Sequence, residues 1–249
     1  MSKQVTGDAA VLIVGASGGI GAALVRHYLQ AADTAAVIAV SRGNRPPCFE
    51  TAGKRLLWRI CDYTETSIAG ELEWASTLGL RMIRVVICNG ILHNERIAPE
   101  KTTARLKGSV MHEVFQANVV VPSLWVGALT RLLPADAECV VAVLSARVGS
   151  ISDNRLGGWH SYRASKAALN MVLKSASVEF ARRFPGVKLL AFHPGTTNTE
   201  LSQPFQRGVP PEKLFTPDFV AGRLASLMDQ LEPDGQLAYL AWDGSKIEW

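Results

Sequence analysis

Tyr162 and Lys166 are the two side chains of this sequence that point most directly to chemistry. They lie four positions apart, and on a helix residues i and i+4 share one face. The ammonium group of Lys166 would then lie beside the phenol of Tyr162 and favour its ionised form, which lowers the pKa of the phenol. A tyrosine tuned in this way can give or take a proton near neutral pH. The same spacing also arises by chance, so the elements around the pair have to decide between the two interpretations.

A glycine-rich turn near the start of the chain lies between two elements that make it informative. Residues 9–14 form a continuous apolar run, typical of a buried parallel strand, and residues 22–31 have the pattern of a helix. The sequence between them contains Gly15, Gly19 and Gly21. Glycines let the backbone turn sharply and approach a pyrophosphate, which free N–H groups and the positive helix end can bind. We expect a dinucleotide site here, although a purely structural turn has the same pattern.

The end of the second apolar strand, residues 35–40, indicates which dinucleotide is bound. An acidic side chain there would bind the ribose hydroxyls of NAD, whereas an arginine accommodates the 2′-phosphate of NADP. This chain has Ser41 and Arg42 and no carboxylate before Glu50. It therefore predicts NADP(H) in preference to NAD(H), with Ser41 as a hydrogen-bond donor and Arg42 as the charge partner. The alternative is that Arg42 is an exposed loop residue without a ligand contact.

Polar and small residues also follow the third and fourth expected strands, residues 55–60 and 82–88. Asp62 can accept a hydrogen bond from an adenine amino group, or it can cap the helix that begins just after it. Gly90, which follows Asn89 at the end of the fourth strand, permits close approach of a cofactor ribose.

The strand expected at residues 187–192 ends in a second turn. Pro194 and Gly195 bring the chain back over the site, and Thr197 and Thr199 can donate hydrogen bonds to an amide or a phosphate.

Residues 109–133 carry apolar positions at helical spacing, and two residues interrupt the pattern. Asn118 places an amide in the apolar face, and Pro122 kinks or breaks a helix nearby. A buried asparagine needs partners, and a bent helix frees a carbonyl group that can hold a water molecule.

Alternating strands and helices over most of the chain predict an α/β fold: a doubly wound parallel sheet in three layers, as one domain over residues 1–249. Ligands bind such sheets at the carboxyl ends of the strands. The glycine turn, the Asn-Gly pair, the helix asparagine and the Tyr-x-x-x-Lys spacing together resemble the short-chain dehydrogenase/reductase family. The Asp-Gly turn at residues 243–244 and the Gly-Ser-Ile at 149–151 resemble its carbonyl reductase branch, which includes C-factor and sniffer-like proteins.

The resemblance implies a mechanism. NADP(H) would exchange a hydride with a carbonyl or alcohol substrate, and Tyr162 would act as proton donor or acceptor. Lys166 would lower the pKa of Tyr162 and bind the nicotinamide ribose, and Asn118 would hold a water molecule that links Lys166 to solvent. The cofactor site implied by the resemblance consists of Gly15, Ser17, Gly19, Ile20, Gly21, Ser41, Arg42, Asp62, Asn89, Gly90, Tyr162, Lys166, Pro194, Gly195, Thr197 and Thr199.

One catalytic residue of the family departs from its usual pattern here. The second serine of a family Ser-Ser-x-x-Gly motif polarises the substrate carbonyl, but counting back from Gly149 places Ala146 at that position and Ser145 one residue early. Neighbouring residues at a strand end point in different directions, so Ser145 replaces the hydroxyl only if the turn is re-registered. Two functions stay open: an NADP-dependent reductase, and an NADP-binding sensor or signalling protein with weak or no catalysis.

The substrate pocket is expected between two segments. Trp159 and His160 would line one wall, although Trp159 can equally anchor its loop to the core. Residues 201–214 contain three prolines and no periodicity, and we expect them to form a lid. An apolar carbonyl compound suits these walls. His193, which precedes a proline at a strand end, is interpreted as structural.

Composition excludes several other classes of function. The net charge of +4 is scattered, which argues against a nucleic-acid partner. Four cysteines without C-x-x-C spacing or a neighbouring His pair predict no metal site. No apolar segment of membrane-spanning length and no leader pattern are present, so we expect a cytoplasmic protein without a membrane partner. The family resemblance implies a homodimer or homotetramer through the helices near residues 109–133 and 166–184.

Overall fold

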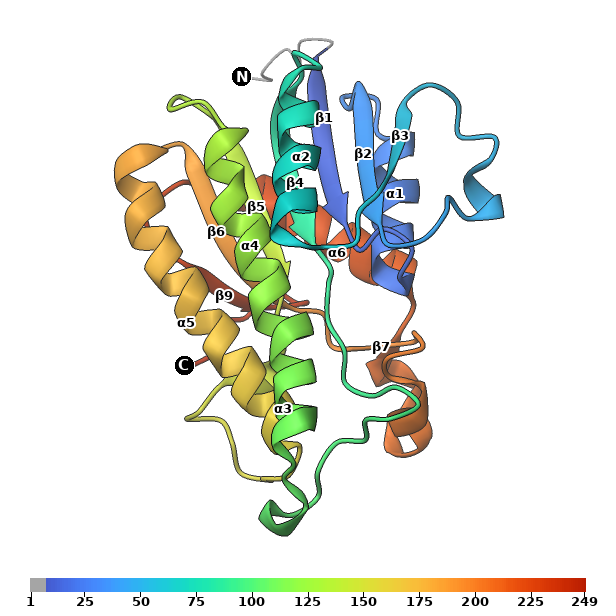
Figure 1. Cartoon of the computed structure of the whole chain (residues 1–249), viewed down its shortest axis with the longest axis vertical. Helices are drawn as coiled ribbons and strands as arrows, with labels where there is room; N and C mark the ends of the chain where they lie inside the picture. Colours follow the sequence, from blue (N-terminus) through green and yellow to red (C-terminus); the bar gives the residue numbers. More distant parts are fainter. Residues whose placement is uncertain (1–7) are drawn as a thin grey trace.

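The computed structural model describes residues 8–249, and a parallel sheet of seven strands runs through it. Its strands are β1 (Ala9–Val14), β2 (Ala36–Ser41), β3 (Leu56–Ile60), β4 (Arg81–Ile87), β5 (Cys139–Leu144), β6 (Val187–His193) and β9 (Ala238–Ala241). They lie in the order β3-β2-β1-β4-β5-β6-β9, and every neighbouring pair is parallel. The carboxyl ends of the strands therefore lie at one edge of the sheet, the lower one in Figure 1.

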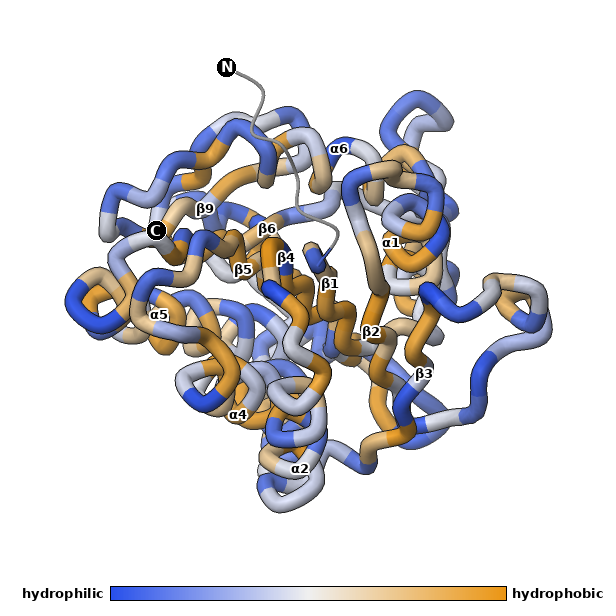
Figure 2. Tube along the Cα trace, turned by 90° about the horizontal axis from the view of Figure 1, so that it is seen from above, coloured by the Kyte–Doolittle hydropathy of each residue, from blue (hydrophilic) through white to orange (hydrophobic). Residues whose placement is uncertain are grey.

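Helices cover both faces of this sheet, which explains why the strands are apolar along their whole length. The helices are α1 (Gly19–Gln30), α2 (Glu65–Ser76), α3 (Gly108–Phe115), α4 (Val121–Ala128), α5 (His160–Arg183) and α6 (Pro217–Gln230). Helices α1 and α6 pack on one face, and α2, α4 and α5 pack on the other. Figure 2 shows the apolar residues gathered in the sheet between these two layers.

Short elements complete the chain near the carboxyl edge and in the loops. Strands β7 (Thr196–Thr197) and β8 (Leu214–Phe215) form a small parallel sheet of their own. Short 3-10 helices occur at Pro47–Phe49, Thr103–Arg105, Leu129–Arg131, Arg147–Gly149, Gln203–Gly208 and Pro211–Lys213.

The predicted fold class is confirmed, and the main differences lie at the ends of elements. Helix α1 begins at Gly19, inside the glycine motif and three residues before the predicted start, so the last glycines belong to its first turn. Helix α5 begins at His160, so Tyr162 and Lys166 lie on its first two turns. The segment 201–214, predicted to lack regular structure, contains two short 3-10 helices and the first residue of β8.

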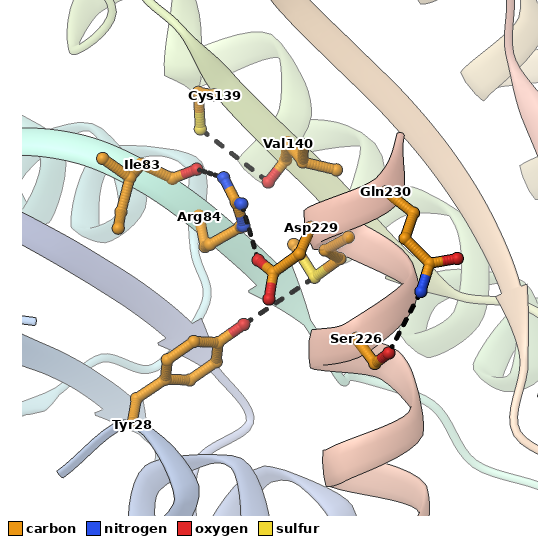
Figure 3. Close-up of polar contacts among 9 residues, drawn as sticks. Tyr28, Ile83, Arg84, Cys139, Val140, Ser226, Asp229 and Gln230 are labelled. Carbon is orange, nitrogen blue, oxygen red and sulfur yellow. Dashed lines mark hydrogen bonds and ion pairs between the residues drawn. The ribbon is translucent and has the colours of Figure 1, made fainter. Parts of the chain in front are cut away.

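Polar contacts fix helix α6 to the sheet (Figure 3). Arg84 of β4 donates a hydrogen bond of 2.8 Å to the carbonyl oxygen of Ile83 and pairs with Asp229 at 2.8 Å. The hydroxyl of Tyr28 on α1 lies 4.0 Å from the sulfur of Met228 on α6, and burial raises the pKa of this phenol. These contacts hold α1, and with it the glycine turn, against the same sheet face as α6.

A π-turn at Gln116–Val120 joins α3 to α4. Pro122, in the first turn of α4, has no N–H to donate to the carbonyl of Asn118, so the regular i to i−4 pattern cannot continue there. The interruption expected near Pro122 is thus confirmed, as a wider turn within one helical run. It brings Asn118 into the interior, where its exposed fraction is 0%.

A residue far away in the sequence holds the N-terminus of α5. Gly157, Gly158 and Trp159 have positive φ angles of 63°, 65° and 51°, which turn the chain sharply into the helix. Glu100 is 5% exposed, and its carboxylate accepts hydrogen bonds from the hydroxyl of Ser161 and from its N–H at 3.1 Å. The main-chain oxygen of Glu100 accepts a further hydrogen bond from the N–H of Trp159 at 2.5 Å. The sequence placed Glu100 in a polar loop and gave no sign of its burial.

We predict that Glu100→Gln lowers the free energy of unfolding at pH 7 by about 1–3 kcal/mol, because a neutral acceptor replaces a charged one at the positive end of a helix. Burial alone would raise the pKa of Glu100, but the hydrogen bonds from Ser161 outweigh it and hold the pKa below its ordinary value of 4.5. The carboxylate therefore stabilises the fold above pH 4.5, and this stabilisation is lost as the pH falls through the folded-state pKa.

Urea unfolding of parent and variant at several pH values measures this effect, and the difference between them should shrink below about pH 4.5. Glu95→Gln makes the same chemical change at an exposed position of the same loop and should alter stability by less than about 0.5 kcal/mol. Equal losses for the two variants would contradict the role given to Glu100.

Candidate functional site

A cavity of about 900 Å³ lies at the carboxyl edge of the sheet. It is bordered by the N-terminus of α1, the ends of β4, β5 and β6, the first turns of α5 and the segment after β7. Most of the residues predicted for the site meet there: Gly15, Ser17, Gly19, Ile20, Gly21, Arg42, Asn89, Gly90, Ser145, Tyr162, Lys166, Pro194, Gly195, Thr197 and Thr199. Ser41, Asp62 and Asn118 lie outside this lining.

The glycine turn forms one end of the cavity. A Cβ at position 21 would lie 2.2 Å from the carbonyl oxygen of Gly15, and one at position 19 would lie 2.6 Å from a methyl group of Thr199. Side chains at these positions would therefore close the turn. Helix α1 has no side-chain cap and no acidic residue in its first turn, which leaves its first N–H groups and its positive end for an anion. The turn fits the pyrophosphate of a dinucleotide.

The end of β2 is hydrogen-bonded to this glycine turn. The hydroxyl of Ser41 is buried, donates a hydrogen bond of 2.8 Å to Ser17 Oγ, and accepts one of 3.2 Å from the N–H of Gly43. Ser41, predicted to donate to the cofactor, therefore donates its hydrogen to the glycine turn. Arg42 is exposed and lines the cavity, where its guanidinium can reach a ligand.

Asp62 does not itself cap α2 but binds Thr64, the residue that does. One of its carboxylate oxygens accepts hydrogen bonds from the N–H and the hydroxyl of Thr64, at 2.9 and 2.8 Å. Thr64 in turn caps α2 by accepting a hydrogen bond of 3.3 Å from the N–H of Ser67. The hydrogen bonds from Thr64 hold the pKa of Asp62 below its ordinary value. Asp62 thus organises the turn that begins α2.

Tyr162 and Lys166 lie side by side within the structure, 9% and 3% exposed. The Lys166 ammonium is 5.8 Å from the centroid of the Tyr162 ring and donates a hydrogen bond of 2.8 Å to the carbonyl oxygen of Leu144. Burial lowers the pKa of Lys166 to about 8. Burial, together with the phenol of Tyr239, raises the pKa of Tyr162. The Tyr162 pKa is thus raised and not lowered as expected from the spacing, because burial dominates.

Asn118 lies behind the pair and joins two elements. Its Oδ1 accepts a hydrogen bond of 2.7 Å from the N–H of Ile91, and its Nδ2 donates to the carbonyl oxygen of Ile91 at 2.9 Å and to Ser165 Oγ at 3.0 Å. Ile91 follows β4, and Ser165 precedes Lys166 on α5. Asn118 therefore fixes the lysine-bearing turn against the end of β4.

Ser145 and Ala146 follow β5, and their side chains have different surroundings. The hydroxyl of Ser145 donates a hydrogen bond of 2.6 Å to Asn170 Oδ1 on α5, so the hydroxyl predicted for the substrate is directed into the packing of that helix. Ala146 packs with Tyr162 and Leu92 in a small apolar cluster. A methyl group thus stands beside the phenol at position 146.

Aromatic side chains form the outer wall. The rings of Trp159 and Phe205 lie 5.0 Å apart, Trp159 lies 6.2 Å from the ring of Tyr162, and His93 lies 5.6 Å from Phe205. Trp159 lines the cavity as predicted, and its ring also bridges α5 and the segment 201–214. Both interpretations of Trp159 therefore hold.

The sequence missed part of this wall. His160, predicted beside Trp159, does not line the cavity. Leu92, Val148 and Phe205 do, although the sequence around them has no pattern that singles them out. The prolines of 201–214 were the available signal for Phe205, since they predicted a functional lid, and Leu201, Ser202, Phe205 and Val209 from that segment do border the cavity.

Two negative findings hold for residues 8–249. No group of three or more His, Cys, Asp or Glu side chains in this range gathers as a metal site. Within the same residues, every helix is too short or too polar to cross a bilayer.

Comparison with known proteins agrees with this geometry. The chain is 34% identical to 1-hydroxy-2-glutathionyl-2-methyl-3-butene dehydrogenase of Rhodococcus sp. strain AD45, over 54% of this chain and 56% of that protein. It is 33% identical to C-signal of Myxococcus xanthus, over 53% of this chain and 69% of that protein. These matches thus span little more than half to about two thirds of the relatives.

A solved structure matches over nearly the whole length. The carbonyl reductase from Pseudomonas aeruginosa PAO1 in complex with NADP superposes with a TM-score of 0.76 and 25% identity, covering 96% of this chain and 99% of that one. The sequence model of the short chain dehydrogenase family matches residues 9–209. Since that match covers well over half of the chain, this protein belongs to the short chain dehydrogenase family.

Proposed function

We propose that this protein is an NADP-dependent oxidoreductase that interconverts a small carbonyl compound and its alcohol, with Tyr162 as proton donor and acceptor. One observation carries the proposal. Tyr162 and Lys166 are buried side by side in the cavity onto which the uncapped N-terminus of α1 opens. A proton-transfer group and an anion site thus share one enclosed space.

The residues around the cavity suit NADP(H). The glycine turn and the first N–H groups of α1 would take the pyrophosphate, and Arg42 would pair with the 2′-phosphate. Asn89 Oδ1 is buried without a hydrogen-bond partner and can accept from a ribose hydroxyl. When bound, the dinucleotide supplies or accepts the hydride. The NADP complex of the Pseudomonas aeruginosa carbonyl reductase supports this cofactor assignment.

The buried pair has the electrostatics for proton transfer. The raised pKa of Tyr162 keeps the phenol protonated at neutral pH, as a donor in the reduction direction requires. Donation leaves a phenolate, which the neighbouring Lys166 ammonium stabilises. Lys166, with a pKa of about 8, is still mostly charged at pH 7. The carbonyl oxygen of Leu144 accepts its hydrogen bond, and Asn118 binds the neighbouring Ser165.

A second function, an NADP-binding sensor or signalling protein with little turnover, is favoured by a specific observation. Ala146 presents a methyl group beside Tyr162, and the hydroxyl of Ser145 donates to Asn170. Losing one oxyanion donor typically slows an enzyme about 100- to 1,000-fold. The two proposals differ in whether bound NADPH is consumed.

The substrate and assembly are also proposals. The wall of Trp159, Phe205 and Leu92 favours an apolar carbonyl compound, and residues 201–214 would act as its lid. We further propose that the chain acts as one domain and forms dimers or tetramers through the helices near residues 109–133 and 166–184, which are α3, α4 and α5. Apolar Met171 and Val178 are exposed on α5, 66% and 45%, which supports such contacts.

We predict that Tyr162→Phe lowers kcat for NADPH-dependent reduction about 100- to 10,000-fold and changes the NADPH Kd less than about threefold, since only the transferable proton is removed. A panel of aldehydes, ketones and quinones, followed at the NADPH absorbance, provides the assay. Tyr28→Phe removes a buried phenol of α1 and should leave kcat unchanged. Micromolar NADPH binding without turnover by the parent would reject the reductase in favour of the sensor.

We predict that Arg42→Ala raises the Kd for NADPH about 10- to 100-fold and leaves the Kd for NADH nearly unchanged, because a charge-assisted contact with the 2′-phosphate is lost. Binding is measured by titration of intrinsic fluorescence. Arg131→Ala, an equal change of charge on the exposed turn after α4, serves as the control and should affect neither Kd. Parallel weakening of both cofactors would contradict the assignment.

We predict that kcat/KM for carbonyl reduction falls as the pH rises through about 8, because Lys166 then loses the charge that stabilises the phenolate. The raised pKa of Tyr162 keeps its proton in place over this range, so the decline belongs to Lys166. A pH–rate profile at saturating NADPH provides the measurement. A constant kcat/KM up to about pH 9.5 would show that the Lys166 charge is not required.

A further inference from the structure

The active-site edge lacks one hydrogen-bond donor that carbonyl reduction needs. Negative charge grows on the carbonyl oxygen as hydride reaches the carbon, and donors aimed at that oxygen stabilise it. Tyr162 is one donor. The family's second donor would stand at Ala146, whose methyl group packs against Tyr162, and Ser145 directs its hydroxyl to Asn170 instead.

His193, the last residue of β6, lies on the strand next to this gap. Leu144 of β5 pairs with Phe192 of β6, and the N–H of Ser145 donates a hydrogen bond of 2.8 Å to the carbonyl oxygen of Phe192. His193 is therefore the neighbour of residues 145–146 on the adjacent strand, and parallel strands lie about 4.8 Å apart.

Strand alternation directs the His193 side chain to the face that carries α5. Ala191 packs in the core beneath α2, α4 and α5, and Phe192 packs in the core on the opposite face. His193 follows Phe192 and so faces the side of the sheet on which α5 carries Tyr162. His193 also lines the cavity together with Tyr162, Lys166 and Ala146.

The imidazole is neutral, and one of its two nitrogens has no hydrogen-bond partner among residues 8–249. Burial lowers the pKa of His193 to about 4; the charge of Arg147 acts in the same direction, and those of Asp243 and Asp153 oppose it. Nδ1 is buried without a hydrogen-bond partner. Because an unpaired buried N–H is rarer than an unpaired acceptor, we assign the single hydrogen to Nε2. The sequence analysis interpreted His193 as a structural residue, a role that does not require the Nε2 hydrogen to bind a ligand.

We propose that His193 donates a hydrogen bond from Nε2 to the substrate carbonyl oxygen and so replaces the serine absent from position 146. This inference rests on the proposed reductase function. In the reaction a C–H bond forms at the carbonyl carbon with the hydride of NADPH, and the π electrons of the C=O bond move to oxygen. The oxygen takes the proton of Tyr162, leaving a phenolate and NADP⁺. His193 keeps its proton throughout and acts as a neutral electrophile.

Three substitutions at His193, each made in the parent and in the Ala146→Ser background, test this assignment. His193→Phe removes the donor and keeps a flat ring. His193→Gln places an amide N–H near the position of Nε2, whereas His193→Asn places it near that of Nδ1. Turnover is measured with the best carbonyl compound of the panel, alongside the melting temperature and the NADPH Kd, which report whether each variant folds and binds cofactor.

We expect His193→Phe and His193→Asn to lower kcat/KM about 100-fold or more in the parent, and His193→Gln to stay within about tenfold of it. In the Ala146→Ser background, where a hydroxyl is restored, His193→Phe should cost less than about tenfold. The melting temperature and NADPH Kd of folded variants should match the parent.

Three results would overturn the inference while leaving the reductase function intact. They are a loss below about threefold for His193→Phe, an equal loss in both backgrounds, or a Gln variant no better than Phe. Absence of turnover in both the parent and Ala146→Ser, with NADPH still bound, would reject the proposed function and this inference with it.

Discussion

The arrangement of the site depends on burying the ammonium group of Lys166 at the end of the sheet. A buried charge is costly unless it is hydrogen-bonded, and this one donates to the carbonyl oxygen of Leu144. Helix α5 must come very close to the strand ends to allow this. A Cβ at Gly149, after β5, would lie 2.8 Å from Lys166 Cβ, and one at Gly90, after β4, would lie 3.4 Å from Lys166 Nζ. A side chain at position 149 would therefore collide with Lys166, whereas the distance at position 90 is an ordinary contact.

The rotation of α5 is fixed by the residues that precede each member of the pair. Ser161, just before Tyr162, is bonded to the buried carboxylate of Glu100. Ser165, just before Lys166, accepts a hydrogen bond from Asn118, which the π-turn carries inward. Two small polar residues, one turn apart, thus tie the helix to two other parts of the chain. Because the tethers are adjacent to the functional residues, a small rotation of α5 would strain them before it displaced the phenol.

How far the sequence predicts this structure depends on whether the decisive contact is local. The strands could be predicted because parallel strands that are covered on both faces are continuous apolar runs. The glycine turn could be predicted because the strand and the helix that flank it are adjacent in the chain. Alternation at a strand end also predicted that Ser145 and Ala146 point in different directions. Glu100 escaped notice because its partner Ser161 is 61 positions away. The sequence predicted a lowered Tyr162 pKa because the spacing shows the neighbouring lysine. Burial raises this pKa, and the degree of burial depends on the whole fold.

Two buried polar side-chain atoms at the carboxyl edge of the sheet have no hydrogen-bond partner. Asn89 Oδ1 follows β4 and His193 Nδ1 ends β6, and each is buried without a partner. Leaving such an atom unpaired costs about 1–3 kcal/mol, and a lysine whose pKa is lowered to about 8 adds a further cost at neutral pH. The apolar core under both helix layers supplies the stability that tolerates these groups. Buried unpaired atoms also occur on Thr34 and Trp125, outside the cavity. Asn89, His193 and Lys166 differ from these because they line the cavity, where an apolar replacement would remove an acceptor, a donor or a charge from the site.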